Sequence, residues 1–393
     1  MLKTSQKTLG LYIHIPFCTF MCHYCDFAKT ANWNESLIHE YVQTLNKHLE
    51  LWLSEFVEKQ GYTIDTLFIG GGTPGLLGSE YEILFRTFDR YRISFKEASI
   101  EVNPENITQD KLSLWKQFGF NRLSMGIQSF QEKGLKTLTR QHTPKQLRNA
   151  LELALSSFNN VNCDLIYAWP GQSMEDWKKD LSSVHEFPIS HLSLYCLTLE
   201  ARTPFGRAHS RGVFTENDVF QEECYEYARE FLHAQNWDHY ECSNWSRENR
   251  NCEHNAKYWQ DQYFIGVGAG ACGYVPGGSV GQRYSYTRKE RIFSKTQMDG
   301  IEDYKNLAIC EFEIRNLEDW LTEYVGCGLR YKEGIDLDLI QFKTGCMFKP
   351  RGLCTEALRD GRLKIIGSRL YLAPSEWIRE TRWCLEVLKT FMS

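Results

Sequence analysis

Three cysteines within eight residues constrain this chain more than any other feature. Cys18, Cys22 and Cys25 follow one another at the spacing C-x-x-x-C-x-x-C, directly after an apolar run that is typical of a strand. Thiolates are the usual ligands of iron–sulfur clusters, so three of them on one short loop can hold three irons of a cubane cluster. The fourth iron then has no protein ligand, and an open coordination position is what a reactive metal site needs.

Two other interpretations of the three thiols stay open at this point. They could hold zinc together with His14 or His23, or they could bind no metal. Zinc sites usually combine two separated pairs of ligands, and the sequence has no matching second pair. The spacing itself resembles that of radical SAM proteins. This resemblance implies a 4Fe-4S cluster whose free iron binds S-adenosylmethionine.

The composition restricts the possible partners and compartment. The chain has 393 residues, of which 42% are hydrophobic, enough for one large domain and a smaller one. Its net charge is −5 and no basic block stands out, so we expect no nucleic-acid partner. The weakly polar stretch 264–275 is about half of the ~20 residues that cross a bilayer, so we expect no integral membrane segment. The polar start and the 14 Cys favour a reduced, cytoplasmic protein.

Strand-like and helix-like patterns alternate through the first part of the chain. Apolar runs predict strands at 11–15, 66–69, 98–102, 122–125, 161–166 and 191–197. Helical periodicity predicts helices that begin at Asn34 and Ser79 and that cover 108–118, 144–158, 175–184 and 216–235. Six such units predict an α/β fold, a partial (β/α)6 barrel with helices outside the sheet. A flat doubly wound sheet is the alternative, but motifs after successive strands favour the barrel.

We predict three regions along the chain. Residues 1–237 form the partial barrel of the radical SAM type. Residues 238–300 are rich in Trp, Asn, Tyr and Gly, break the alternating pattern and form a connecting segment. Residues 301–393 look mainly helical and end in short strands near 363–372. We expect them to form a smaller, winged-helix-like C-terminal domain.

Glycines and polar residues at the ends of the predicted strands are candidates for binding a cofactor. The run 70–74 (GGGTP) offers backbone N–H groups where only glycine permits close approach, although a tight turn would use the same residues. Glu101 and Asp164 can accept hydrogen bonds from an amine or a ribose hydroxyl, with a surface or capping role as the alternative. Gln128 and Arg140 are further polar candidates from the next loops.

Eight motifs together resemble the oxygen-independent coproporphyrinogen III oxidase family over nearly the whole chain. They are 12–18 (YIHIPFC), 70–74 (GGGTP), 101–104 (EVNP), 122–129 (RLSMGIQS), 164–167 (DLIY), 191–195 (HLSLY), 254–259 (HNAKYW) and 328–330 (GLR). The resemblance implies that the cluster is held by Cys18, Cys22 and Cys25. It also implies that the S-adenosylmethionine region is lined by Tyr12, Tyr24, Gly71, Gly72, Thr73, Glu101, Gln128, Arg140 and Asp164.

The family divides into true oxidases and HemW-type haem chaperones, and two features favour the chaperones. The oxidases carry a further Cys two residues beyond the third cluster Cys, where this chain has Phe27. The motif 254–259 resembles one associated with haem binding, which makes His254 a candidate haem contact, with a structural histidine as the alternative. Cys272 departs from the His that is common in HemW relatives, and 168–169 (AW) replaces the more usual Gly-Leu.

The resemblance therefore implies a haem chaperone that binds a 4Fe-4S cluster, S-adenosylmethionine and haem and passes the haem to an acceptor protein. The alternative is the oxidase, which decarboxylates coproporphyrinogen III in porphyrin biosynthesis. There the reduced cluster cleaves S-adenosylmethionine and the resulting radical takes hydrogen from a propionate. Whether the chain is an enzyme, and which residue ligates haem iron, stay open.

Overall fold

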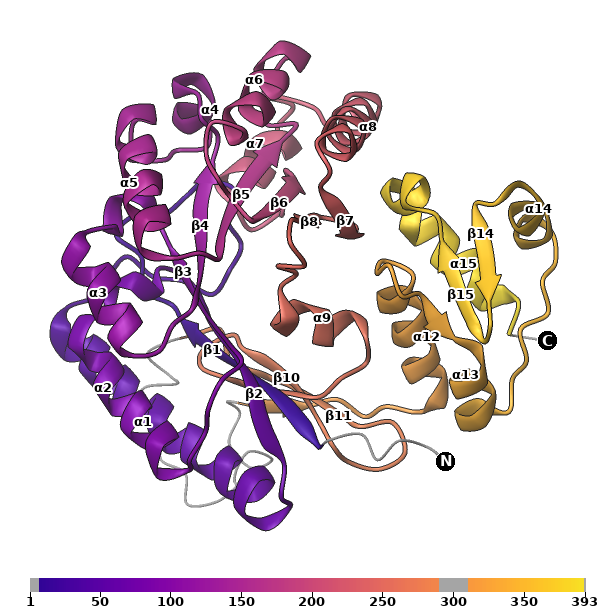
Figure 1. Ribbon diagram of the computed structural model, residues 1–393, viewed down its shortest axis with the longest axis horizontal. Coiled ribbons are helices and arrows are strands. Elements are labelled where there is room, and N and C mark those ends of the chain that lie inside the picture. Colours follow the sequence, from indigo (N-terminus) through magenta and orange to yellow (C-terminus); the bar gives the residue numbers. More distant parts are fainter. Residues whose placement is uncertain (1–6, 290–309, 392–393) are drawn as a thin grey trace.

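The computed structural model describes residues 7–289 and 310–391. Figure 1 shows a curved sheet with helices along its outer side, and a smaller group of C-terminal elements to one side. Hydrogen-bonded neighbours in the sheet follow the order β12-β11-β10-β9-β1-β2-β3-β4-β5-β6-β8-β7. Among the residues that are described, no helix combines the length and the apolar character needed to cross a membrane.

Six neighbouring parallel strands form the centre of the sheet; five contain a predicted strand completely, and the sixth ends one residue before its predicted end at 197. They are β1 (Thr8–Ile15), β2 (Thr63–Gly71), β3 (Glu97–Val102), β4 (Arg122–Gln128), β5 (Val161–Tyr167) and β6 (His191–Cys196). Side chains alternate between the two faces of a strand. In β1, Leu11, Ile13 and Ile15 are fully buried in the main hydrophobic core, whereas Tyr12 and His14 line a cavity inside the curve.

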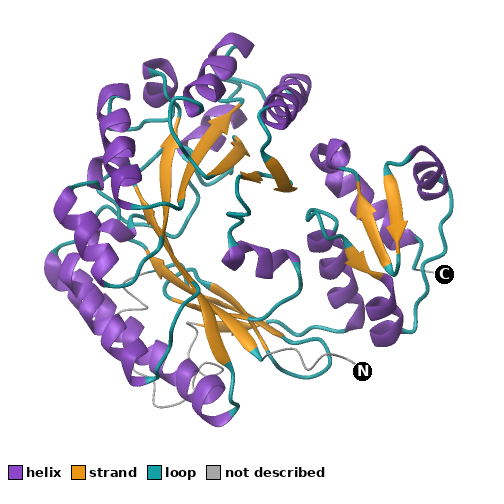
Figure 2. Cartoon of the chain, viewed as in Figure 1, coloured by secondary structure: helices purple, strands orange, loops and turns teal. Residues whose placement is uncertain are grey.

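Helices connect these strands along the outer face of the sheet. They are α1 (Glu35–Leu53), α2 (Tyr81–Arg90), α3 (Gln109–Gln117), α4 (Glu132–Thr137), α5 (Pro144–Ser157), α6 (Met174–Val184), α7 (Pro204–Ser210) and α8 (Asp218–Ala234). Figure 2 shows them as a purple layer outside the orange strands. Helices on one face of a curved parallel sheet confirm the partial barrel and exclude the doubly wound alternative, which has helices on both faces.

The helix boundaries follow from capping residues. Asn34 accepts a hydrogen bond from Leu37 N and starts α1 as predicted. The α-helical part stops at Leu53 and continues as a π-helical turn, Ser54–Lys59. Ser79 lies in a short 3-10 turn just before α2. The helices α4 and α7 were not predicted, because six or seven residues give too little periodicity to recognise.

The segment 238–300, predicted only to connect two domains, contributes strands to both edges of the sheet. One edge gains β7 (Asp238–Glu241) and β8 (Asn244–Ser246), and the other gains β9 (Phe264–Val267), β10 (Cys272–Val275) and β11 (Gln282–Tyr286). The helix α9 (Glu253–Trp259) lies between these two groups in the chain. Strands of three to five residues are too short to show an alternating pattern, which is why the sequence did not reveal them.

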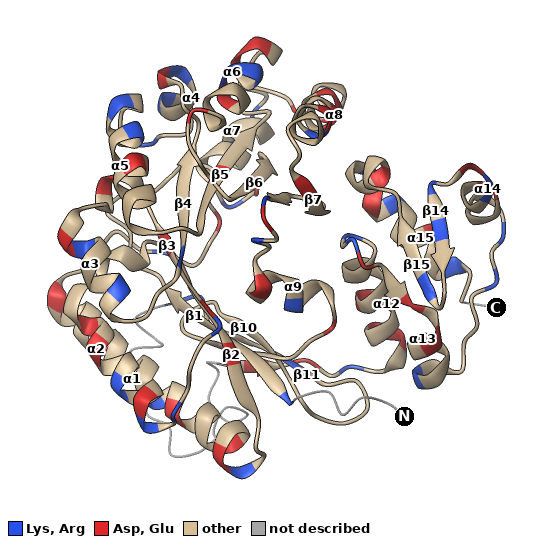
Figure 3. Cartoon of the chain, in the orientation of Figure 1, with Lys and Arg blue, Asp and Glu red and all other residues tan. Residues whose placement is uncertain are grey.

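The C-terminal part contains four helices and a small antiparallel sheet, the winged-helix-like arrangement that we expected. After β12 (Cys310–Phe312), which joins the large sheet, come α12 (Leu317–Gly328), β13 (Ile335–Asp336), α13 (Leu337–Thr344), α14 (Leu353–Asp360), β14 (Leu363–Ile366), β15 (Arg369–Leu372) and α15 (Glu380–Lys389). The strands near 363–372 are confirmed, although α15 follows them. The predicted boundary at 300/301 lies outside the described residues. Figure 3 shows acidic and basic positions interspersed over the helices.

Candidate functional site

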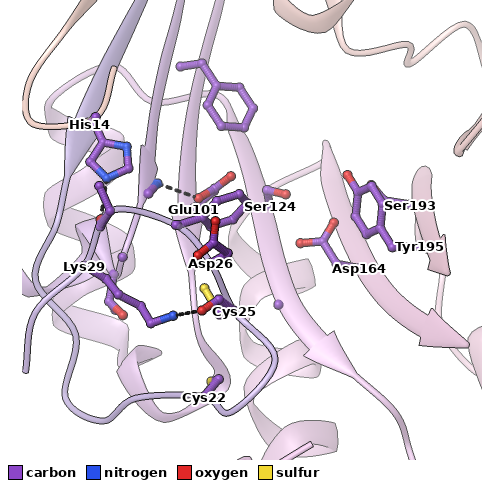
Figure 4. Close-up of a pocket in the computed structure, with 18 of the residues that line it drawn as sticks. His14, Cys22, Cys25, Asp26, Lys29, Glu101, Ser124, Asp164, Ser193 and Tyr195 are labelled. Carbon is purple, nitrogen blue, oxygen red and sulfur yellow. Dashed lines mark hydrogen bonds between the residues drawn. The ribbon is translucent and has the colours of Figure 1, made fainter. Parts of the chain in front are cut away.

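A cavity of about 900 Å³ lies inside the curve of the sheet. Its lining comes from the inner face of β1 to β6, from the loops that follow these strands, and from β9 to β11 and α12. This volume is in the range of ligand-binding pockets. The structure places every predicted site residue on its lining except His254; these residues are Tyr12, Cys18, Cys22, Tyr24, Cys25, Gly71, Gly72, Thr73, Glu101, Gln128, Arg140 and Asp164. Figure 4 shows part of this lining.

The loop that carries the three thiols is fixed at its base by backbone hydrogen bonds. Cys18 N donates to Thr30 O over 2.9 Å, and Thr30 N donates to Pro16 O over 2.7 Å. Thr73 N donates to Phe17 O over 2.7 Å, which joins the loop to the end of β2. Cys18 is buried, and burial raises the pKa of its thiol to about 11. These hydrogen bonds fix the base of the loop beside the cavity.

Glycines at the end of β2 permit this close contact. Gly71 has a φ of 116°, and a Cβ at that position would lie 2.6 Å from the ring of His14. A Cβ on Gly72 would lie 2.7 Å from the carbonyl oxygen of Phe17 and 2.9 Å from the sulfur of Cys18. All three distances are shorter than real contacts of a Cβ. A larger residue at Gly71 would therefore displace the ring of His14, and one at Gly72 would displace the cysteine loop.

All three thiols of the cysteine loop line the cavity. In the described ranges, no three His, Cys, Asp or Glu side chains come together as ligands of a single ion. His14 is engaged elsewhere, since its ring nitrogens lie 2.9 Å from Tyr12 OH and 2.7 Å from Ala28 O. A cubane cluster binds each thiolate at a different iron, so separate positions around one cavity suit a cluster.

Two half-buried carboxyl groups project into the cavity from neighbouring parts of the sheet, as Figure 4 shows for Glu101 and Asp164. Glu101 accepts a hydrogen bond from Gly71 N over 2.9 Å, and burial raises the pKa of Glu101 to about 7. Asn162 Nδ2 donates to Asp164 Oδ1 over 2.7 Å, and burial raises the pKa of Asp164 as well. Two carboxyl groups on one wall favour a ligand with positive charge.

Arg140 links the cysteine loop to the ends of the strands. Its Nη2 donates to Asn103 Oδ1 over 2.6 Å and to Gly126 O over 2.9 Å, while Nη1 lies 3.5 Å from the sulfur of Cys22. Gln128 lies nearby with a φ of 66°, and its Oε1 is buried without a partner. An unpaired amide oxygen on the lining is available to a ligand that donates a hydrogen bond.

His254 is separated from the cavity. Its side chain is completely buried in α9, with Nδ1 2.9 Å from Thr66 Oγ1 and Nε2 2.8 Å from Tyr258 OH. Burial lowers the pKa of His254 to about 3, so the ring is neutral. This environment favours the structural alternative, and the haem contact of His254 stays a prediction. The residues of α9 that do line the cavity are Asn255 and Tyr258.

Several cavity residues escaped the sequence analysis because they come from the unpredicted strands and from the C-terminal part. They are Phe264, Arg283, Arg288, Glu323 and Cys327. No local motif marks them, and only the pairing of β9 with β1 brings their part of the chain to the site. Cys272 was noted as an unusual residue, and the structure places it on the lining.

Comparison with known proteins identifies the family. Residues 12–184 match the radical SAM superfamily. The haem chaperone HemW of Escherichia coli (strain K12) is 36% identical over 291 residues, which cover 72% of this chain and 75% of that protein. HemW of Lactococcus lactis is 30% identical over 353 residues, which cover 88% of this chain and 87% of that protein. This chain belongs to the HemW family of radical SAM proteins.

The solved structures agree with this family at the level of the fold. Coproporphyrinogen III oxidase (HemN) from Escherichia coli, a radical SAM enzyme, superimposes with a TM-score of 0.77 and 20% identity over 97% of this chain and 90% of that chain. Membership of the radical SAM superfamily implies a 4Fe-4S cluster and S-adenosylmethionine. The lining of this HemW-family cavity fits both, because it combines three thiols on one loop with two half-buried carboxyl groups.

Proposed function

We propose that this protein is a haem chaperone that holds a 4Fe-4S cluster, S-adenosylmethionine and haem, and that passes the haem to an acceptor protein. One observation carries the proposal: a single cavity is lined both by the three-thiol loop and by the aromatic side chains of Tyr12, Phe68, Tyr258 and Phe264. The relatives named as haem chaperones are similar over most of their length, which supports the same role.

The cluster would be held by Cys18, Cys22 and Cys25, and it would supply an electron to bound S-adenosylmethionine. The protein's part is to bind and orient that molecule. S-adenosylmethionine carries an ammonium and a sulfonium, and both charges suit the carboxyl groups of Glu101 and Asp164. The backbone at Gly71 and Gly72 lets the ligand approach the end of β2, since no side chain is in the way.

Haem would lie against the aromatic residues of the same cavity. The rings of Tyr12 and Phe68 stack with centroids 6.3 Å apart and an interplanar angle of 28°. Tyr258 and Phe264 pack edge to face at 4.5 Å on the neighbouring wall. Aromatic faces of this kind bind large flat apolar ligands well. We further infer a cytoplasmic location for such a carrier, and this stays a prediction.

Phe27 favours the chaperone over the oxidase. It lies on the lining and 65% of the residue is exposed, so no thiol is offered where the oxidases have their additional cysteine. A phenyl ring cannot act as a redox group or exchange a proton. The reaction that would use that thiol therefore has no equivalent group at this position.

The test uses one anaerobically reconstituted sample for two measurements. Haem titration should give a saturable Soret band. The same sample, supplied with reductant, S-adenosylmethionine and coproporphyrinogen III, should form no protoporphyrinogen. Turnover of coproporphyrinogen without saturable haem binding would reject the chaperone and support the oxidase.

A further inference from the structure

A row of side chains on the inner face crosses the sheet at one level of the cavity. Tyr12 on β1 pairs with Phe68 on β2, Phe68 pairs with Ser99 on β3, and Ser99 pairs with Arg122 on β4. Tyr12, Phe68 and Arg122 all line the cavity. The row therefore runs from two stacked aromatic rings to a guanidinium group.

The guanidinium of Arg122 is poorly satisfied for a buried charge. Only 2% of the residue is exposed, and its Nη1 lies 3.5 Å from Ser99 Oγ. Its Nε has no hydrogen-bond partner within the described ranges 7–289 and 310–391. No ion pair of Arg122 is found among the described residues. The buried carboxylate of Glu97 already accepts bonds from the backbone N–H groups of Glu253 and His254 at the start of α9. A buried guanidinium of this kind favours a ligand that brings a carboxylate.

Cys272 lies at the other end of the row. A Cβ added to Gly266 on β9 would lie 1.8 Å from the carbonyl oxygen of Cys272, so the two backbones are in close contact. Gly266 in turn pairs with Tyr12 on β1. Cys272 is exposed, and it lines the same cavity as Arg122. From β10 to β4 there are five strand-to-strand steps, roughly 24 Å along the sheet and less across its curve.

Cys272 is also more accessible to haem iron than His254, the haem contact that the sequence predicted. Both ring nitrogens of His254 are hydrogen-bonded and the residue is fully buried. Iron could reach that imidazole only after α9 had moved and both hydrogen bonds had broken. The sulfur of Cys272 needs no such change, and a cysteine thiolate is an established axial ligand of haem iron.

We propose that the sulfur of Cys272 ligates the haem iron and that Arg122 pairs with a propionate carboxylate of the same haem. This inference rests on the proposed haem binding and deepens it. The iron–sulfur bond forms as the thiol releases its proton to solvent, and the oxidation state of the ferric iron does not change. The aromatic rings of Tyr12 and Phe68 lie between the two fixed points.

The first experiment follows the iron ligand. Ferric haem is titrated into the reconstituted full-length protein, and the bound haem is recorded by electron paramagnetic resonance and by the Soret band of its ferrous carbonyl form. Wild type should show a thiolate-ligated haem. Cys272→Ala should lose that signature and bind haem at least tenfold more weakly. Cys272→His should regain affinity with an imidazole spectrum, while Cys327→Ala, which removes another thiol of the lining, should match wild type.

The second experiment follows the carboxylate. Wild type should bind haem more tightly than haem dimethyl ester, in which both propionates are masked. Arg122→Met should weaken haem binding at least fivefold and leave binding of the diester unchanged. If this variant fails to fold, Arg122→Gln removes the charge with a polar side chain and provides the same comparison, and the wild-type preference for free propionates tests the idea without any variant.

The outcomes separate this inference from the function on which it rests. No saturable haem binding by wild type would reject the proposed function and the site with it. Haem binding with the same spectrum and affinity in wild type and in Cys272→Ala would overturn the cysteine ligand alone. Equal affinity of wild type for haem and its diester would overturn the role of Arg122.

Discussion

Glu101 is half-buried at the end of β3, where the surrounding protein replaces part of the water that would stabilise its charged form. Burial and the nearby charge of Asp164 raise the pKa of Glu101 from 4.5 to about 7, although the hydrogen bond from Gly71 N opposes the shift. The folded protein therefore holds a proton that the unfolded chain releases at lower pH. This group makes the ligand-free fold less stable as the pH rises from 4.5 to about 7.

Binding of a cationic ligand should show the opposite dependence. S-adenosylmethionine favours the ionised carboxylate, so its affinity should increase as the pH rises through about 7, and binding below that pH should release a proton. Glu101→Gln should lower the affinity about tenfold to a hundredfold, the effect of losing one charge-assisted hydrogen bond, and should flatten the pH dependence. Calorimetry in buffers of different ionisation enthalpy measures both effects. An unchanged slope in the variant would exclude Glu101 as the titrating group.

The three thiols of the cysteine loop should be equally necessary for the cluster. Cys18→Ala, Cys22→Ala and Cys25→Ala should each abolish it, because two thiolates leave two irons of a cubane without protein ligands. Cys327→Ala also removes a thiol from the cavity and serves as the control. Iron, sulfide and visible absorbance after anaerobic reconstitution report the result. Wild-type iron content in any of the three loop variants would contradict the assignment.

At the scale of single residues, the sequence identified the groups that carry chemistry but not all of their surroundings. The spacing of the thiols and the position of Glu101 after a strand were enough to predict their place on one lining. His254 shows the limit of a motif. His254 and Tyr258 are four residues apart and lie on the same face of α9, where the Tyr258 hydroxyl is hydrogen-bonded to the ring of His254. Tyr258 reaches the cavity and His254 is fully buried, and only packing decides which of the two is exposed to a ligand.

At the scale of elements, capping residues decide where the outer helices begin. Thr143 starts α5 with a capping box, in which its hydroxyl accepts a hydrogen bond from Gln146 N and the Gln146 side chain accepts one from Thr143 N. These bonds satisfy N–H groups that the first turn of a helix leaves free. The same chemistry allowed the sequence to place the start of α1 at Asn34.

Removing this cap should have a measurable cost. Thr143→Ala should lower the free energy of unfolding by about 1 kcal/mol, since Gln146 N then has no side-chain acceptor. Glu152→Ala changes an exposed position of the same helix and should stay within about 0.5 kcal/mol of wild type. Urea unfolding of the two variants gives the comparison. Equal stabilities would show that the cap does not contribute.

The sheet edges show what local patterns leave out. The six central strands are long enough, at six to nine residues, to show an apolar or alternating pattern, and the sequence predicted them all. Strands β7 to β12 have five residues or fewer and are held by pairing with neighbours that are distant in the chain. Such strands depend on the tertiary structure for their stability, so their own sequence carries little information.

At the scale of the whole molecule, the C-terminal part completes the wall of the cavity. Glu323 and Cys327 of α12 lie on the lining, and Glu323 forms ion pairs with Arg283 of β11 and with Arg315. Trp320 Nε1 donates to Asp261 Oδ2 over 2.9 Å, which joins α12 to the chain after α9. The winged-helix-like part is therefore connected to the site. The sequence predicted its existence but not this contact.

The central claim is that the three-thiol loop holds a cluster whose free iron meets S-adenosylmethionine in this cavity. The most direct measurement is the electron paramagnetic resonance spectrum of the reduced, reconstituted protein before and after addition of S-adenosylmethionine, with metal and sulfide analysis of the same sample. We predict iron and sulfide in the ratio of a 4Fe-4S cluster and a spectrum that changes when S-adenosylmethionine is added. Zinc in place of iron, or a cluster spectrum that S-adenosylmethionine leaves unchanged, would contradict the account.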